Sequence, residues 1–233
     1  MATATRKPRK SKKEEIRIWN TYRVGLQFDG EFGGQIPRSE KEIRKMLEHR
    51  MPGRKPEGAV PIEELVEQVA TETPVQDEES EDYVPGWSTF KRSTDGNLLY
   101  EGRCVRGHLK DCALQVAGFF PAIKAFRAKV VNSLYVVNKT MPLLGSSLNV
   151  ISEIHDTEQR FIQVMTRQGP RSAIKYIDYI LDPYLEFDIK LRADKVIEIS
   201  HIESILEYGS LHGMGAERSQ GWGRYTVERI TER

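Results

Sequence analysis

The sequence is poor in cysteine and contains no long apolar run. Its only two cysteines, Cys104 and Cys112, lie eight positions apart in 233 residues, without a CxxC pair or a His/Cys spacing typical of zinc sites. This pattern predicts neither a metal site nor a disulfide framework, and it favours a reducing, cytoplasmic setting. No segment approaches membrane-spanning length, and the N-terminus has no signal-peptide hydrophobic region. We therefore expect no membrane partner and no cofactor.

Positive charge is missing from one long segment. Between Pro56 and Phe90 there is no Lys or Arg, yet ten Asp and Glu residues occur. The rest of the chain holds 35 basic and 24 acidic residues, so a net charge of +1 conceals a basic body with an acidic insertion. A basic excess favours polyanionic partners such as nucleic acid. The alternative to a polyanionic partner is that the two regions are only solvated surfaces of opposite charge.

The distribution of charge also suggests the domain organisation. Residues 1–18 form a basic tail, with six of the eight residues from Arg6 to Lys13 basic, and such a tail is expected to be disordered. It could contact nucleic acid or serve only solubility. Residues 19–233 are expected to form one domain, with an acidic and partly flexible insertion at 56–88.

Hydrophobic periodicity predicts alternating strands and helices. In the first half we expect a strand at 22–28, a helix from Ser39 with Glu42 at its capping-box position, a helix at 61–70, a hairpin at 90–100 and a helix at 102–120. In the second half we expect strands at 130–138 and 160–167, one or two strands within 173–193, a helix at 195–208 ending at Gly209, and a last strand from Tyr225. This order predicts an α+β fold, a ferredoxin-like or RRM-like antiparallel sheet with helices on one face.

The segment before the last strand is rich in glycine and arginine. Glycines permit positive φ angles and close approach of backbone amides to a ligand, and neighbouring arginines suit phosphate. Trp222 offers a face for stacking on a base. The segment follows a helix and precedes a strand, which excludes the P-loop and dinucleotide fingerprints. Tight turns alone remain the alternative. The residues concerned are Gly213, Gly215, Arg218, Gly221, Gly223 and Arg224.

A second basic segment opens the helix predicted at 102–120. Arg103, Arg106 and Lys110 recur at three- and four-residue spacing and share one helix face. The positive end of the helix dipole lies beside them, which favours phosphate contact. A solvated helix face is the alternative.

Two motifs together resemble the RAMP superfamily of CRISPR-associated proteins, and within it the Cas-seven-type backbone subunits of type III effectors. The first is a Thr-Asp-Gly hairpin turn followed by Y-x-G-x-x-x-R-G-x-L-K; the second is G-x-G-x-x-R-S-x-G-x-G-R-Y near the end. The family's first motif typically reads Pro-Gly-Ser-Ser-Leu-(Lys/Arg)-Gly, and residues 101–107 lack its Ser-Ser pair.

The resemblance implies an RRM-like ferredoxin fold that holds guide RNA by its phosphates, often in a filament of homologous or related subunits. It implies that Arg103, Arg106, Gly107 and Lys110 face the RNA, and that the glycine-rich segment forms a second contact. The strong acidity of residues 56–85 departs from an insertion that grips RNA.

Catalytic candidates are few. Some RAMP proteins are metal-independent endoribonucleases that use a histidine, and His49 lies near Arg44 and Lys45 at the end of a predicted helix. Asp29 follows the first strand, where type III backbone subunits can carry an aspartate that supports cutting of target RNA. A surface histidine and a turn aspartate are the alternatives.

Four hypotheses follow. The leading one is a non-catalytic subunit of a CRISPR-type ribonucleoprotein that binds single-stranded guide RNA, and possible partners include target nucleic acid. The second is a guide-RNA-processing endoribonuclease. The third is a single-stranded nucleic-acid-binding protein of a phage or mobile element, and the fourth is an interaction module whose acidic insertion docks a partner.

Overall fold

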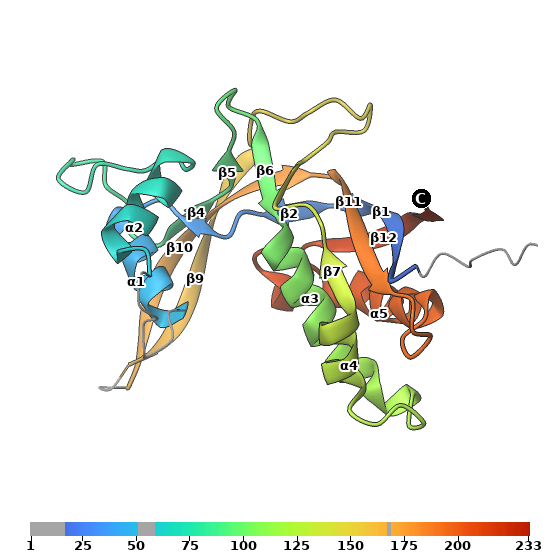
Figure 1. Cartoon of the computed structure of the whole chain (residues 1–233). Helices are drawn as coiled ribbons and strands as arrows, with labels where there is room; N and C mark the ends of the chain where they lie inside the picture. Colours follow the sequence, from blue (N-terminus) through green and yellow to red (C-terminus); the bar gives the residue numbers. More distant parts are fainter. Residues whose placement is uncertain (1–16, 51–58, 167–168) are drawn as a thin grey trace, which may run out of the picture.

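The computed structural model describes residues 17–50, 59–166 and 169–233 (Figure 1). The basic run from Arg6 to Lys13, and with it nearly all of the predicted tail, lies outside these residues. So do the first residues of the acidic insertion, 56–58. Within the described part of the chain, no helix is long and apolar enough to cross a membrane.

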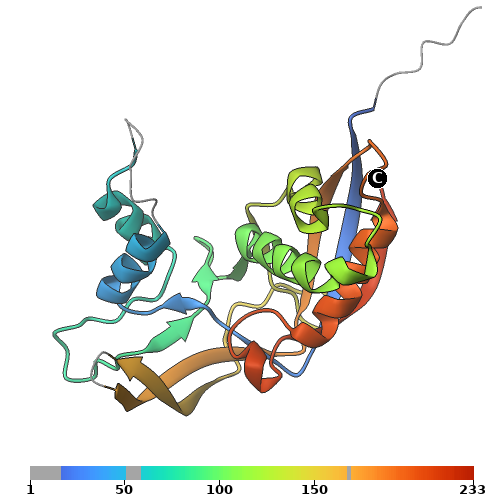
Figure 2. The ribbon, with the colours of Figure 1, turned by 90° about the horizontal axis from the view of Figure 1, so that it is seen from below.

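A four-stranded antiparallel sheet, which we call the main sheet, forms one half of the molecule. Its strands are β1 (Trp19–Asp29), β7 (Leu134–Val136), β11 (Tyr184–Arg192) and β12 (Arg224–Glu232), in the order β12-β1-β11-β7. Helices α3 (Gly102–Gln115) and α5 (Ile199–His212) lie side by side on one face of this sheet, as Figure 2 shows. The α+β class predicted from the sequence is confirmed.

The core fills the space between the main sheet and these two helices. Alternate residues of β1, Val24, Leu26 and Phe28, point into it and are buried. The period of two along the strand gives the sheet one apolar face and leaves the other polar. The helix residues that the sequence predicts to face the core are also all buried: Val105, Leu109, Cys112, Ala113 and Val116.

A second sheet extends from the end of β1; the sequence predicted its two long strands, at 160–167 and within 173–193, but not that they form a separate sheet. It contains β2 (Glu31–Gly33), β3 (Ile36–Pro37), β4 (Trp87–Thr89), β9 (Asp156–Thr166) and β10 (Gly169–Leu181). β9 and β10 form a long hairpin, and β10 pairs in parallel with β4. Three of its strands have only two or three residues, too few to show periodicity.

A small third sheet contains the predicted hairpin. Its strands are β5 (Lys91–Arg92), β6 (Leu98–Glu101) and β8 (Thr140–Pro142). Gly96 takes the positive φ of 81° at the turn, as its Asp-Gly sequence predicts.

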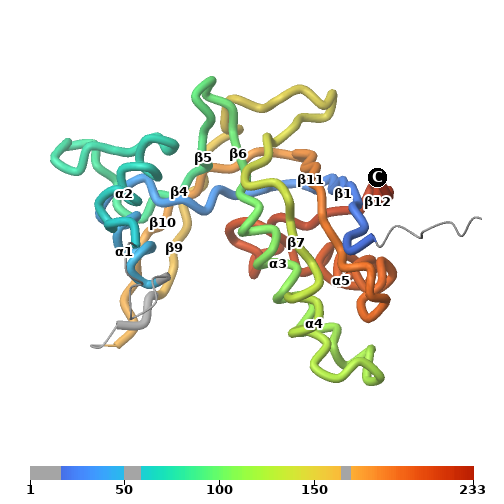
Figure 3. The backbone as a smooth tube through the Cα atoms, viewed as in Figure 1, coloured from blue at the N-terminus to red at the C-terminus, as the bar shows by residue number. Residues whose placement is uncertain are grey.

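The acidic insertion packs beside the helix that precedes it. α1 (Glu40–Arg50) lies against α2 (Ile62–Thr71), and both stand apart from the main sheet (Figure 3). Ser39 is the N-cap as predicted, with its Oγ accepting from the Glu42 amide at 3.3 Å. The Glu78 carboxylate of the insertion accepts from the Ser39 hydroxyl and the Lys41 amide, and these hydrogen bonds lower its pKa. An anionic side chain is thus fixed at the positive end of α1.

Two element predictions were wrong. Residues 130–138 are not one strand, because α4 (Phe126–Ser133) takes the first half and β7 the second. Gly209 does not end the last helix, which runs on to His212. A Cβ at Gly209 would lie 2.2 Å from Tyr225 Oη and 2.6 Å from His108 Nε2, so this glycine is required for close packing rather than for a helix end.

Candidate nucleic-acid interface

The segment from Gly213 to Gly223, which we call the glycine loop, joins α5 to β12 and has a buried base. The Met214 amide donates to Gly223 O at 2.8 Å, the Ala216 amide to Gly33 O at 3.1 Å, and the Gly223 amide to Glu31 O at 2.8 Å. Amides that are bonded to protein carbonyls are not available to a ligand. The close approach of free amides to a ligand, which the glycines led us to expect, is therefore wrong for the base of the loop.

Two of the four glycines are required by the loop's own backbone. A Cβ at Gly223, where φ is +68°, would lie 1.7 Å from Met214 O; one at Gly213, where φ is +76°, would lie 2.5 Å from Trp222 O. L side chains avoid such φ angles, and no backbone carbonyl can yield by that much. These glycines fix the loop rather than admit a phosphate.

Trp222 is not available for base stacking. It is buried against Ile177 and Ala216, with its ring 5.3 Å from that of Tyr179. The Arg160 guanidinium covers the ring at 4.7 Å from its centroid. The expected stacking role is therefore wrong, and Trp222 anchors the loop to the second sheet instead.

The tip of the loop is exposed and positively charged. Arg218 and Ser219 line a cavity of about 430 Å³ with His212, Gly215 and Glu217. Glu217 is already paired with Lys175, at 2.8 Å, and lies 3.9 Å from Arg160. Arg218 contacts the imidazole of His212, with Nη1 3.4 Å from Nε2. The carboxylate of Glu217 is thus neutralised by Lys175 and not by Arg218, so Arg218 keeps an uncompensated positive charge.

Arg224 extends this positive region to the start of β12. Its side chain is exposed, and its guanidinium lies about 3.6 Å from where a Cβ at Gly221 would be. Among the residues described, neither Arg218 nor Arg224 forms an ion pair with a carboxylate. Both arginines are therefore free to bind an anion.

Below the cavity lies a buried polar cluster that the sequence did not reveal. His108 of α3 is 3% exposed, and its Nε2 lies 2.9 Å from Tyr225 Oη, which in turn donates to Leu206 O. Burial, with smaller effects of His212 and Arg218, lowers the pKa of His108 to about 3. Burial likewise raises the pKa of the Cys112 thiol to about 12. The histidine is neutral at neutral pH and serves packing.

The basic face of α3 is less available than the sequence suggests. Arg103 donates to the Glu101 carboxylate from both Nε and Nη2, and Glu101 also pairs with Lys91 at 3.4 Å. Arg106 is half-buried, with Nη2 donating to Val131 O at 3.3 Å and its guanidinium over the Tyr135 ring. Lys110 is partly exposed, and no ion pair is found for it in the described residues. Gly107 has open space beside it.

The two catalytic candidates lie far from each other. His49 is exposed on α1, where its Nδ1 lies 2.7 Å from Lys45 O, and α1 packs against α2 and β3, away from the glycine loop in Figures 1 and 2. Asp29 is exposed at the end of β1, directly opposite Arg224 in the strand register. The fold brings Asp29, but not His49, to the glycine loop; a catalytic role for either stays a prediction.

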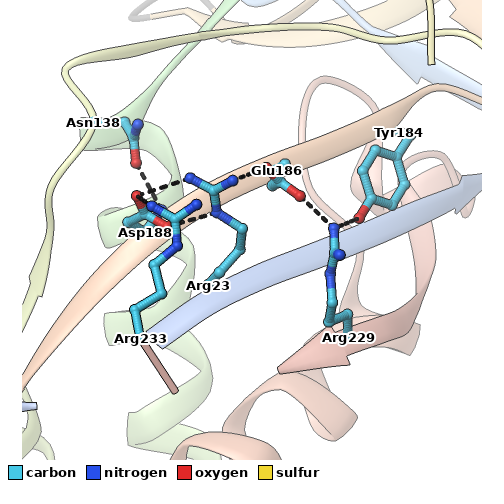
Figure 4. A network of polar contacts seen from close by, with 7 residues as sticks. All are labelled: Arg23, Asn138, Tyr184, Glu186, Asp188, Arg229 and Arg233. Carbon is cyan, nitrogen blue, oxygen red and sulfur yellow. Dashed lines mark hydrogen bonds and ion pairs between the residues drawn. The ribbon is translucent and has the colours of Figure 1, made fainter. Parts of the chain in front are cut away.

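The polar face of the main sheet carries arginines of another kind. Arg23 lies between Glu186 and Asp188, as Figure 4 shows. It pairs with them at 2.7 and 2.9 Å, and Arg229 pairs with Glu186 at 2.5 Å. Arg233 adds a contact to Asp188 at 3.4 Å. Hydrogen bonding to Arg23 lowers the pKa of Asp188. These cations are compensated within the protein.

Comparison with solved structures shows that this chain is similar to chains of known structure. No protein-family model and no curated protein matches the sequence. A chain in a solved structure, the cryo-EM structure of the Type III-B Cmr-beta bound to cognate target RNA, matches with a TM-score of 0.44 and 11% identity. The match covers 92% of this chain and 61% of that chain, so this chain spans less than two thirds of the other.

Proposed function

We propose that this protein is a non-catalytic subunit that binds single-stranded RNA, with the tip of the glycine loop holding RNA phosphates. The observation that carries the proposal is the pair Arg218 and Arg224. Both are exposed and without a carboxylate partner among the described residues. Arg218 lines a cavity whose acid, Glu217, is paired with Lys175, and Arg224 begins β12 directly after the loop. Guanidinium groups bind phosphate in two-pronged fashion, and they do so best where no carboxylate competes.

The order of the main sheet supports a ferredoxin-like interpretation of the fold. Along the chain, β1, α3, β7, β11, α5 and β12 form a β-α-β-β-α-β series with the last strand beside the first. Together with the two sequence motifs, this arrangement favours the RAMP hypothesis. The RNA would then be a guide RNA in a CRISPR-type ribonucleoprotein, and related subunits and target nucleic acid would be the further partners.

Binding of a fluorescent single-stranded RNA, followed by anisotropy, tests the proposal. Replacing both Arg218 and Arg224 by Glu should weaken binding by about 30-fold or more, since two attractions to phosphate become repulsions. In the milder Gln variants, the slope of log affinity against log salt should fall by about 1.4, or about 0.7 for each phosphate that the protein no longer neutralises. Arg106 is a poorer target, because a glutamate in its half-buried place would disturb the fold.

The matched control reverses two exposed cations near α4, Lys124 and Arg127, and changes the net charge equally. It should alter the affinity by less than about threefold. Equal losses in both variants would reduce the effect to net charge and contradict the assignment of the site. A DNA strand of the same sequence shows whether the 2′-hydroxyl matters. Cleavage of the RNA in EDTA would instead favour the endoribonuclease hypothesis.

A further inference from the structure

An acidic groove runs along the outer edge of the main sheet, between α5 and β12. Its volume is about 500 Å³, with Val227 and Ile230 among its apolar lining residues. Three exposed glutamates line it, Glu203 and Glu207 one helical turn apart on α5 and Glu228 on β12. None of the three forms an ion pair within the described part of the chain.

The groove lacks both a counter-charge and a neighbouring strand. Arg229 is the only cation among its lining residues, and its guanidinium is held by Glu186 at 2.5 Å. β12 is the last strand of the main sheet and pairs only with β1 in the residues described. Proteins commonly cover such an edge, because its open backbone groups invite pairing with other chains.

The described structure begins beside the end of β12, two residues beyond Ile230, the last β12 residue that lines the groove. Arg17, the first described residue, pairs with Glu232 at 3.3 Å and donates to Arg233 O at 3.1 Å. These partners are the last residue of β12 and the residue after it, so the described chain begins beside the end of the edge strand. Lys13 and Arg6 can extend up to about 14 and 38 Å from Arg17, and β12 is about 30 Å long.

We propose that the basic residues 6–13 lie in the groove between α5 and β12 of the same chain, against Glu203, Glu207 and Glu228. The opposite charges, the length of the segment and its point of entry all agree with this occupant. Docked there, the segment also covers the unpaired edge of β12. The inference goes beyond RNA binding and does not rest on it.

Limited trypsin digestion of the full chain tests the proposal. Mass spectrometry measures the rate of cleavage after the basic residues from Arg6 to Lys13, at low salt and without nucleic acid. The variant Glu203→Gln/Glu207→Gln/Glu228→Gln should be cut about five- to tenfold faster in this segment, because three charge pairs are removed. At about 0.5 M salt the difference should disappear.

A control variant removes the same charge elsewhere. Glu64→Gln/Glu67→Gln/Glu81→Gln neutralises three exposed acids of the insertion and should leave the rate unchanged. Equal acceleration in both variants, or in neither, would overturn the proposal. Loss of protection on about hundredfold dilution would assign the groove to a second copy and overturn it too. Should the groove variant fold poorly, Lys12→Glu/Lys13→Glu provides the reverse test, with faster cleavage after Arg6 and Lys10 expected.

Discussion

Two regions of this molecule are rich in arginine, and they use it in opposite ways. On the polar face of the main sheet, Arg23, Arg229 and Arg233 lie against Glu186 and Asp188 and hold neighbouring strands together. At the glycine loop and the start of β12, Arg218 and Arg224 have no carboxylate partner among the described residues, and the acid beside Arg218, Glu217, is paired with Lys175. The two regions have a similar number of arginines, but only those at the loop have a positive charge that a ligand can bind.

The difference changes where nucleic acid is expected to bind. An RRM-like protein would be expected to present its open sheet face to RNA. Here the arginines of that face are paired with carboxylates of the same protein. Tyr184 lies over Gly25, and a Cβ at Gly25 would be 2.0 Å from the tyrosine hydroxyl. The tyrosine is 9% exposed and thus is not free to stack on a base. The loop tip is therefore the stronger candidate.

The largest effect is expected when the support of the loop is broken. Gly223→Ala should lower the free energy of unfolding by about 3 kcal/mol or more, because its Cβ meets a backbone carbonyl. It should also displace Arg218 and Arg224 and weaken RNA binding. Urea unfolding and anisotropy measure the two effects.

The control for this variant is Gly96→Ala. Gly96 has a similar φ of +81°, but nothing lies within 4 Å of its Cβ position. It should cost only about 1 kcal/mol, the penalty of the left-handed conformation, and leave RNA binding intact. Equal costs for the two variants would show that the close packing of the loop is unimportant.

A smaller effect is expected from pH, through the buried histidine below the loop. His108 has a pKa of about 3 in the folded protein against an ordinary value of 6.5, so only the unfolded chain takes up a proton between these values. The stability is therefore full above pH 6.5 and falls on acidification, by up to about 1.4 kcal/mol per pH unit. Urea unfolding between pH 7 and pH 5 should show a loss of about 2 kcal/mol.

This window lies above the ordinary pKa values of carboxylates, so histidines are the side chains that titrate in it, and variants assign the slope to one of them. The variant His108→Gln should be less stable than the unchanged protein at pH 7, but its free energy of unfolding should depend much less on pH between pH 7 and pH 5. The exposed His49→Gln is the matched control and should keep the pH dependence. An unchanged slope in His108→Gln would contradict the burial of a neutral imidazole.

The smallest effect concerns the compensated arginines of the sheet. Arg23→Gln removes the main partner of Asp188, whose side chain is 16% exposed, and should cost about 1–2 kcal/mol of stability. RNA affinity should stay within about twofold of the unchanged protein, because this arginine is already neutralised. A large loss of affinity without unfolding would move the binding site to the sheet and remove the contrast with the loop.

Much of the fold could be predicted because its signals are local. The alternation of Val24, Leu26 and Phe28 indicated a strand, and the spacing of Val105, Leu109 and Cys112 indicated a helix and its buried face. In the second sheet only the long strands β9 and β10 had such a signal. β3 has two residues and owes its existence to partners far along the chain. The role of Gly209 was missed for the same reason, because its neighbours come from α3 and β12.

The candidate site likewise has some features that follow from the local sequence and others that depend on contacts between distant residues. The sequence by itself determined that glycines and arginines would gather before the last strand, since composition and order are fixed along the chain. Only the tertiary structure decided which of them a ligand can reach. In the folded protein Trp222 is buried, and two amides of the loop donate to carbonyls of β2. Glu217 is paired with Lys175, and Arg218 is exposed. Burial and charge pairing are relations between distant residues, and for that physical reason no local pattern records them.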